Sequence, residues 1–229
     1  MKLSIIIPVY NEEKTIAEVI TKIKDIKLPK DLTKEIIVVD DGSKDNSQSI
    51  LRRIKGIKLF SHETNKGKGA AVRTGLNNAK GDIIVIQDAD LEYNPQQIPQ
   101  VISPILSKEA EVVYGLRFLK KGNENWKLPA HYVGNRILSF LTNLLYGCNL
   151  SDMETGYKAF TKKAKESINL ESNDFGFEVE FTAKICKKGF KIKEVPIKYR
   201  PRLWNEGKKI TWKDGAKAFY YLIKFRFRK

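Results

Sequence analysis

The sequence has few cysteines, and it has no long apolar run. Its two cysteines, Cys148 and Cys186, are too few for a disulfide framework and are typical of a reducing compartment. No apolar stretch reaches the roughly 20 residues that a membrane-spanning helix needs. The apolar run at residues 3–9 ends in a polar turn, which is not the pattern of a secretory signal. We therefore expect a cytoplasmic protein rather than a secreted scaffold or an integral membrane protein.

Several motifs of nucleotide and metal chemistry are also missing. There is no G-x-x-x-x-G-K-[ST] loop, no G-x-G-x-x-G after a strand and no G-x-S-x-G. The two histidines, His62 and His131, lie far apart, and no Cys or His stands at metal-ligand spacing. These absences remove the usual support for ATPase, NAD-dependent and serine-hydrolase chemistry. We expect both histidines to be structural or exposed.

What the chain has in excess is positive charge, with 42 basic and 27 acidic residues and a net charge of +15. Its 41% of hydrophobic residues is typical of a globular chain of 229 residues. The charge is uneven, because residues 1–115 carry net +1 and residues 116–229 carry net +14. Nucleic acid, anionic lipid and phosphorylated substrates are the partners that such a surface suits. A lysine-rich composition without any such partner is the alternative interpretation.

The first half alternates short apolar runs with helical patterns. We expect strands at residues 3–9, 35–39, 57–60, 82–86 and 111–114, and helices at 12–24, 69–79 and 98–106. Ser43 is predicted to cap a further helix that carries Ile50, Leu51 and Ile54. Apolar strands between helices predict an α/β fold with a mostly parallel sheet that is buried on both faces.

The second half is less regular. It predicts helices at residues 131–146 and 178–188, an extended segment at 195–199 and a basic amphipathic helix at 212–229. The apolar side expected for the first of these helices consists of Val133, Ile137, Phe140, Leu141, Leu144 and Leu145. The helices at 131–146 and 212–229 suit either a membrane interface or an ordinary core. We expect a catalytic domain over residues 1–211, with residues 212–229 in the same compact unit.

Three polar clusters follow predicted strands, at residues 10–12, 40–43 and 88–90. Because parallel α/β sheets bind ligands beyond the carboxyl ends of their strands, we expect these clusters at one edge. Asp88 and Asp90 would repel each other unless a cation lay between them, and oxygen ligands favour Mg²⁺ or Mn²⁺. Simple loop structure is the alternative for this pair, as turn formation is for residues 40–43. Residues 65–69 precede a helix, so their N–H groups and lysines, including Lys68, would suit phosphate.

Taken together, these motifs resemble a known family. Residues 5–13, 38–43, 65–69 and 87–90 occur in order and are similar to the family 2 glycosyltransferases of the GT-A, Rossmann-like fold. Residues 115–117, 152–160, 175–180, 194–196 and 202–210 resemble the branch of dolichyl- and polyprenyl-phosphate sugar synthases. The resemblance covers residues 3–215.

The resemblance implies a role for individual residues. Those implied to line the nucleotide are Pro8, Tyr10, Glu12, Val38 and Asp40. Those implied to hold Mg²⁺ or Mn²⁺ are Asp88 and Asp90, with Ala89 packed at the donor and Glu92 as a third candidate ligand where some relatives have Gln. Those implied to bind the anionic groups are Arg117 and Arg136 for the acceptor phosphate, and Arg202 and Lys208 for the donor diphosphate. Glu178, which replaces a Lys of some relatives, would face the sugar or the metal.

The implied reaction is an inverting transfer of a hexose from a GDP-mannose- or UDP-glucose-type donor to a polyprenyl or dolichyl phosphate. A lipid phosphate is already anionic at neutral pH, so the reaction requires no general base, and a divalent ion offsets the charge of the leaving diphosphate. Catalysis would then rest on Asp90, Arg117 and Arg136. The expected location is the cytoplasmic face of an anionic membrane, as a peripheral protein. A family 2 enzyme with a glycan or other non-lipid acceptor is the first alternative, and a basic nucleic-acid-binding module is a more remote one.

Overall fold

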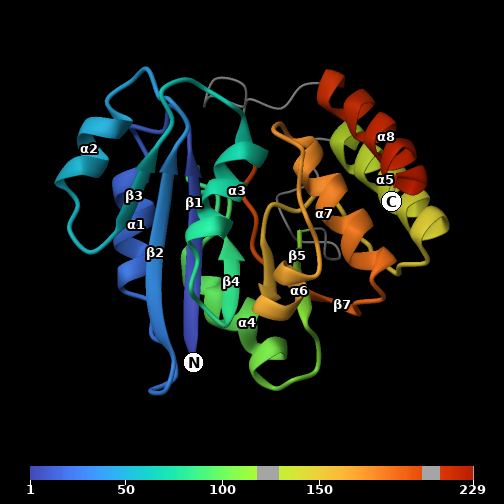
Figure 1. The fold of residues 1–229 in the computed structure, drawn as a ribbon, viewed down its shortest axis with the longest axis horizontal. Helices are drawn as coiled ribbons and strands as arrows, with labels where there is room; N and C mark the ends of the chain where they lie inside the picture. The colour runs from blue at the N-terminus through green and yellow to red at the C-terminus, as the bar shows by residue number, and fades with distance from the viewer. Residues whose placement is uncertain (118–128, 203–211, 229) are drawn as a thin grey trace.

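The computed structural model describes residues 1–117, 129–202 and 212–228, and the side chains of residues 129–131 and 212–214 are left aside. Lys208 and the side chain of His131 therefore lie outside the described residues. In the described part, seven strands form one sheet (Figure 1). The strands are β1 (Lys2–Val9), β2 (Thr33–Asp40), β3 (Lys58–Ser61), β4 (Ile83–Ile86), β5 (Val112–Leu116), β6 (Lys158–Thr161) and β7 (Ile192–Pro196).

The sheet has the order β3-β2-β1-β4-β6-β5-β7. Strand β6 runs antiparallel to both of its neighbours, β4 and β5, and all other neighbouring pairs are parallel. The prediction of a mostly parallel α/β sheet is confirmed.

Helices cover both faces of this sheet, because the side chains of the central strands alternate between two cores. Ile5 and Ile7 of β1 pack into the core that also contains residues of α1 (Ile16–Lys24) and α4 (Ile98–Leu106). Ile6 packs on the other face, into the core formed with α3 (Lys68–Asn78) and α7 (Gly176–Lys187). The shorter helices are α2 (Ser47–Arg53), the 3₁₀ turn η1 (Pro95–Gln97) and α6 (Lys162–Glu166).

Two local predictions differ from the structure, and one strand was missed. Ser43 does not cap a helix, because α2 begins only at Ser47 and the Ser43 hydroxyl accepts a hydrogen bond from the Asn11 N–H. The extended segment expected at residues 195–199 begins earlier, as β7 at Ile192. Strand β6 was not predicted, since it is four residues long and starts with a lysine.

Helix α5 (Pro129–Tyr146) has its polar side inward and much of its apolar side outward. Asn135, Ser139 and Thr142 are buried. The exposed large apolar side chains of this helix are Val133, Ile137, Phe140 and Leu144. The buried polar groups bond the segment after the helix, since Ser139 Oγ accepts from the Met153 N–H at 3.0 Å. The apolar side predicted for residues 131–146 therefore does not form one core-facing surface.

Helix α8 (Trp212–Phe227) packs against α7 and α5 at the outer side of the molecule (Figure 1). Ala218, Leu222 and Phe225 face inward. Its exposed large side chains are Phe219, Tyr220, Ile223 and Phe227. Among the described residues, no helix combines the length and the apolar character needed to cross a membrane.

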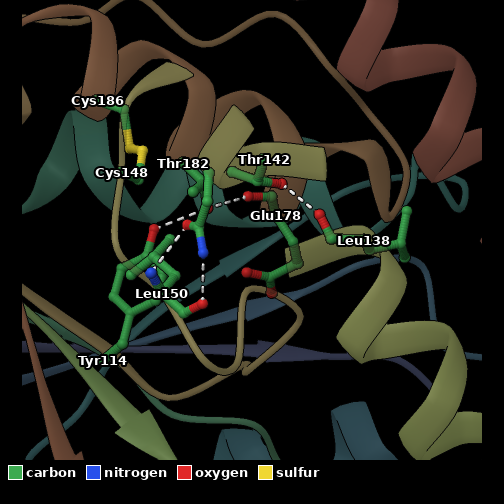
Figure 2. Close-up of a disulfide and its surroundings, with 9 residues drawn as sticks. Tyr114, Leu138, Thr142, Cys148, Leu150, Glu178, Thr182 and Cys186 are labelled. Atoms are coloured by element: carbon green, nitrogen blue, oxygen red, sulfur yellow. Dashed lines mark hydrogen bonds between the residues drawn. A yellow bond between two sulfur atoms is a disulfide. The ribbon is translucent and has the colours of Figure 1, made fainter. Parts of the chain in front are cut away.

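A disulfide joins Cys148, just after α5, to Cys186 in α7 (Figure 2). The pairing corrects the expectation that these cysteines stay reduced. The disulfide lies beside two buried hydroxyl groups, because the Tyr114 hydroxyl oxygen is 2.7 Å from Thr182 Oγ1. Thr182 Oγ1 in turn donates to the Glu178 carbonyl at 2.8 Å. The bridge therefore fixes the helix that carries Glu178 to the end of α5.

Candidate active site

The carboxyl ends of three adjacent strands, β2, β1 and β4, bring the predicted polar clusters to one edge of the sheet. The Asp41 N–H donates to the Val9 carbonyl at 2.8 Å. The Gln87 N–H donates to the Ile6 carbonyl at 2.9 Å. These bonds continue the pairing of the strands into the loops, so Tyr10, Asp40 and Asp88 start from neighbouring positions.

The loops after β1 and β2 are tied together by reciprocal hydrogen bonds. Asn11 has a positive φ of 52°, a conformation that asparagine tolerates better than most residues. Its N–H donates to Ser43 Oγ at 2.9 Å, and its Oδ1 accepts from the Lys44 N–H at 2.8 Å. The Glu12 N–H donates to Ser47 Oγ at 2.8 Å. This framework fixes the start of the loop that presents Glu12.

Asp41 organises the segment at residues 65–69. Its carboxylate accepts hydrogen bonds from the N–H groups of Lys66 at 2.9 Å and Gly67 at 2.7 Å. His62 Nδ1 lies 2.6 Å from Asp41 Oδ1, which gives His62 the structural role expected for it. The Ala70 N–H donates to the Asn173 carbonyl at 3.1 Å. Two of the N–H groups expected to meet phosphate are therefore bonded within the protein, and a phosphate contact of the rest of this segment stays a prediction.

Asp40, Val38 and Ala89, three residues predicted to bind the donor, are buried. Asp40 Oδ1 accepts from the Ser43 N–H at 3.3 Å, which is the turn structure considered for residues 40–43. Pro8 and Tyr10 are half-buried at the end of β1. Their contacts with a nucleotide stay a prediction.

The side chain of Lys68 turns into the site and connects two acidic residues from distant parts of the chain. Its ammonium lies 2.8 Å from Asp88 Oδ1 and 3.1 Å from Glu178 Oε1. Glu178 also pairs with Lys158, which is fully buried in β6. Burial opposes the charge of Lys68, but Asp88 and Glu178 outweigh it and raise its pKa above the ordinary value. A continuous row of alternating charges thus runs from Asp88 to Lys158.

Asp90, in contrast to Lys68, lies near side chains of its own charge. Burial, together with the negative charges of Asp88 and Glu92, raises the pKa of Asp90 to about 8, although Arg202 acts against the shift. Gly156 allows Asp88 to pack closely, because a Cβ atom there would lie 2.3 Å from Asp88 Oδ2. The site therefore holds more negative charge around Asp90 than its own side chains neutralise.

Both carboxylate oxygens of Glu92, the third candidate metal ligand, accept hydrogen bonds from the protein. Its Oε2 accepts from the Tyr199 hydroxyl at 2.6 Å, and its Oε1 accepts from the Arg202 N–H at 2.9 Å. Within the described residues, no three His, Cys, Asp or Glu side chains converge as a metal-binding group. Glu92 thus holds the segment after β7 in place, and its role as a metal ligand beside Asp88 and Asp90 stays a prediction.

Arg202 connects the loop after β1 with the loop after β4. Its guanidinium donates to both carboxylate oxygens of Glu12, at 3.0 and 2.7 Å, and to the Asp90 carbonyl at 2.8 Å. The structure therefore brings Glu12, Asp90 and Arg202 together, as their shared donor role predicts. The contact of Arg202 with a diphosphate stays a prediction.

Arg117 is held in a buried ion pair. Its Nε and Nη2 donate to the two oxygens of Asp152 at 2.8 and 2.7 Å, and its guanidinium carbon lies 5.2 Å from the centre of the Tyr199 ring. Asp152 is fully buried, and its N–H donates to Glu194 at 2.9 Å. Arg136 is exposed on α5 and forms no ion pair within the described part of the chain. The contacts of Arg117 and Arg136 with an acceptor phosphate stay a prediction.

Sequence reasoning assigned no role to Asp152 or Lys158. Both lie in the motif at residues 152–160, but their partners, Arg117 and Glu178, are 35 and 20 residues away. A signal was present for Lys158, because a lysine between the apolar residues Tyr157 and Ala159 must either bend away or find a buried anion.

Comparison with known proteins identifies the family. The family described as Glycosyl transferase family 2 matches residues 4–168. The chain is a family 2 glycosyltransferase. Its sheet and flanking helices are those of the GT-A fold.

Two curated relatives of this glycosyltransferase align with nearly its whole length. A UDP-N-acetylglucosamine–dolichyl-phosphate N-acetylglucosaminyltransferase of Methanococcus voltae is 34% identical, over 98% of this chain and 96% of the relative. A dolichol-phosphate mannosyltransferase of Pyrococcus furiosus is 31% identical, over 97% of this chain and 62% of the relative. Both relatives are thus named for sugar transfer to dolichyl or dolichol phosphate.

The solved structures show the same fold at lower identity. The glucosyl-3-phosphoglycerate synthase of Mycobacterium tuberculosis, in complex with Mn²⁺, UDP and phosphoglyceric acid, superposes with a TM-score of 0.75. It is 22% identical, and the match covers 99% of this chain and 78% of that one.

Proposed function

We propose that this glycosyltransferase moves a hexose or N-acetylhexosamine from a nucleotide-diphospho-sugar to a polyprenyl or dolichyl phosphate at a membrane surface. Two relatives above 30% identity are named for dolichyl or dolichol phosphate, one with an N-acetylglucosamine donor and one for mannose. The observation that carries the proposal is the joining of Glu12, Asp90 and Arg202 at one edge. That edge combines carboxylates, which suit a cation, with a guanidinium, which suits a diphosphate.

The donor would lie across the ends of β1, β2 and β4. Asp40 and Glu12 suit the nucleoside, whose hydroxyl and N–H groups donate to carboxylates. Arg202 and Lys68 suit the diphosphate, although each is paired with acidic residues in this conformation. Donor binding would therefore exchange protein ion pairs for contacts with phosphate. Lys208 would extend this set, and Glu178 would face the sugar.

Asp88 and Asp90 fit a divalent cation such as Mg²⁺ or Mn²⁺. The raised pKa of Asp90 reflects burial and the uncompensated charges of Asp88 and Glu92, and a cation would relieve the repulsion. Hard carboxylate oxygens are the ligands that these two ions prefer. When bound, the ion would offset the charge that develops on the leaving nucleoside diphosphate.

The acceptor phosphate would reach the site from the side of Arg117 and α5. The phosphate is a charged nucleophile, so the protein has to position it near the sugar without removing a proton. The Arg117 guanidinium is fixed by Asp152 and is ready to attract an anion at that position. Arg136, exposed on α5, would meet the phosphate before Arg117 does.

The inverted helix α5 supports a membrane-bound acceptor. A helix that buries Asn135, Ser139 and Thr142 while exposing Phe140 and Leu144 is arranged for an apolar surrounding. Helix α8 adds exposed apolar groups next to it, of which Phe227 is 83% exposed. The net charge of +14 in the second half would attract the anionic cytoplasmic leaflet. The enzyme would then bind peripherally through α5 and α8.

A transfer assay tests the reaction. The purified chain is incubated with UDP-N-acetylglucosamine, UDP-glucose or GDP-mannose, with Mg²⁺ or Mn²⁺, and with a short polyprenyl phosphate. We expect transfer from one of these donors and its loss on addition of EDTA. A parallel arm offers a glycan and 3-phosphoglycerate as acceptors. Transfer to either in preference to the polyprenyl phosphate would contradict the proposed acceptor.

Vesicle flotation tests the membrane surface. The wild type should float with vesicles that contain phosphatidylglycerol, and the double variant Phe140→Glu/Leu144→Glu should float at least 10-fold less. The matched control is Thr21→Glu/Ser103→Glu, which adds the same charge at exposed positions of α1 and α4, on the other side of the sheet. If both double variants lose flotation equally, the loss comes from the added negative charge and not from the apolar face of α5. A wild type that does not float would contradict a peripheral enzyme.

A further inference from the structure

We propose that Glu154 and Asn135 bind hydroxyl groups of the transferred sugar and thereby contribute to the choice of donor. The inference rests on the proposed transfer reaction but concerns two residues to which neither the sequence motifs nor the relatives assign a role. It starts from two buried polar atoms that have no hydrogen-bond partner in the part of the chain that the structure describes.

The two orphaned atoms belong to residues that contact each other, through the side chain of Asn135 and the backbone N–H of Glu154. Glu154 Oε1 and Asn135 Nδ2 are buried, and neither has a hydrogen-bond partner among the described residues. Asn135, on the inward side of α5, is only 5% exposed. Its Oδ1 accepts from the Glu154 N–H at 3.2 Å, which fixes the orientation of the amide. Buried polar atoms without partners are rare in folded proteins, and each costs stability unless a ligand or water satisfies it.

Glu154 lies between the two halves of the proposed site. The charges that act on it come from Glu178 and Lys158 on the donor side and from Arg117 and Asp152 on the acceptor side. The transferred sugar has to occupy this junction, because it bonds first to the donor diphosphate and then to the acceptor phosphate. Gly156, two residues after Glu154 in the sequence, packs closely against the Asp88 carboxylate. This contact places the segment next to the candidate metal ligands.

The chemistry of the pair selects a neutral group that both donates and accepts. A phosphate would meet the carboxylate of Glu154 and be repelled. A cation would be repelled by the amide N–H groups of Asn135, because their hydrogens carry partial positive charge. A hydroxyl donates to Glu154 Oε1 and accepts from Asn135 Nδ2, so a sugar satisfies both orphaned atoms. Charge-assisted hydrogen bonds of this kind are the stronger ones, and they discriminate between sugars that differ in the position of one hydroxyl.

The experiment compares the sugar-bearing donor with its bare nucleotide. Calorimetry measures the affinity of Glu154→Gln and Asn135→Asp for the donor that the wild type uses, chosen from UDP-N-acetylglucosamine, UDP-glucose and GDP-mannose, and for the matching UDP or GDP. We expect a loss of about 10- to 100-fold for the nucleotide-sugar. Affinity for the nucleoside diphosphate should stay within about twofold of the wild type. Glu166→Gln and Asn169→Asp, the same changes at exposed positions, serve as controls.

Donors that lack one hydroxyl sharpen the assignment. The deoxy-sugar donor that binds worst to the wild type should lose no further affinity in Glu154→Gln, because the interaction is already absent. Equal losses for nucleotide-sugar and bare nucleotide would mean a general structural role, and no loss for either would mean that only water occupies the pair. Both results would overturn the inference while leaving transfer by the wild type intact. A wild type that binds none of the donors would instead contradict the proposed function and this inference with it.

Discussion

The two halves of the molecule hold their acidic residues in different ways. At the donor edge, Asp41 accepts hydrogen bonds from backbone N–H groups, and Asp40 does the same in its turn. In the second half of the chain, Asp152 and Glu178 are paired with the side chains of Arg117 and Lys158. Asp40 and Asp41 thus shape loops, whereas Asp152 and Glu178 are neutralised by basic side chains of the second half.

This difference changes the meaning of the net charge. Arg117 and Lys158 count toward the +14 of residues 116–229, yet both are consumed inside the protein. The charge that remains for a partner lies at exposed positions such as Arg136 and Arg226. We therefore expect substitutions in the donor half to change activity more than stability, and substitutions of the paired charges in the second half to lower stability as well as activity.

The largest effect is expected at Asp90. The variant Asp90→Asn removes a candidate metal ligand and should lower transfer by roughly 1,000-fold or more, since charge at the leaving group is then poorly offset. The fold should persist, because neutralising Asp90 also removes its repulsion with Asp88 and Glu92. Transfer rates and thermal unfolding check both parts. Asp31→Asn, at an exposed position, is the control, and activity of Asp90→Asn close to that of the control would refute the metal-binding role.

The donor half was also the part that sequence reasoning predicted best. Its strands are continuous β-branched runs such as Ile5–Ile7, whose burial on both faces leaves few alternatives to a parallel sheet. The edge position of Asp88 follows from that topology alone. Ser43 was misassigned because its hydroxyl serves a tertiary contact with Asn11, which local capping rules do not contain.

The second half was less predictable for physical reasons. Periodicity says which residues of α5 share a side of the helix but not which side faces inward, and here buried polar groups such as Ser139 bond neighbouring backbone. The pairing of Arg117 with Asp152 spans 35 residues, a separation at which the sequence carries no signal. Strand β6 is short and contains a buried lysine, which strand propensities disfavour.

The paired charges supply the next largest effect. Replacing Arg117 by Met leaves the fully buried Asp152 without its cation, which should lower the free energy of unfolding by about 3–5 kcal/mol. Urea denaturation measures the loss. Arg136→Met, at an exposed site on the same side of the molecule, should change stability by less than about 0.5 kcal/mol. If the two variants are equally stable, the contrast between the halves does not hold at this pair.

Reduction of the disulfide should have a smaller effect. The bridge closes a loop of 38 residues between Cys148 and Cys186, and opening it increases the entropy of the unfolded chain. We expect dithiothreitol to lower the free energy of unfolding by about 2–4 kcal/mol. The double variant Cys148→Ser/Cys186→Ser should match the reduced wild type and should not respond to the reductant. A wild type that also fails to respond would mean that the cysteines stay reduced in solution, as their number suggests.

The smallest effect expected in the second half is the dependence of stability on pH at Glu154. Burial, with the charge of Glu178, raises the pKa of Glu154 to about 7 against the opposing charges of Lys158 and Arg117. Below the ordinary pKa of a glutamate, near 4.5, the residue is protonated in both the folded and the unfolded chain. Between about 4.5 and 7 the unfolded chain releases this proton more readily, so the group costs stability as pH rises.

Glu154→Gln cannot ionise and should escape that cost. Its free energy of unfolding should exceed that of the wild type by an amount that grows from pH 4.5 to 7 and reaches at most about 3 kcal/mol. Urea titrations at several pH values measure the difference between the two proteins, in which the contributions of all other groups cancel. Glu166→Gln, an exposed glutamine substitution, should show no such trend. A difference that is independent of pH would mean that Glu154 ionises normally, because water reaches its carboxylate in the folded protein.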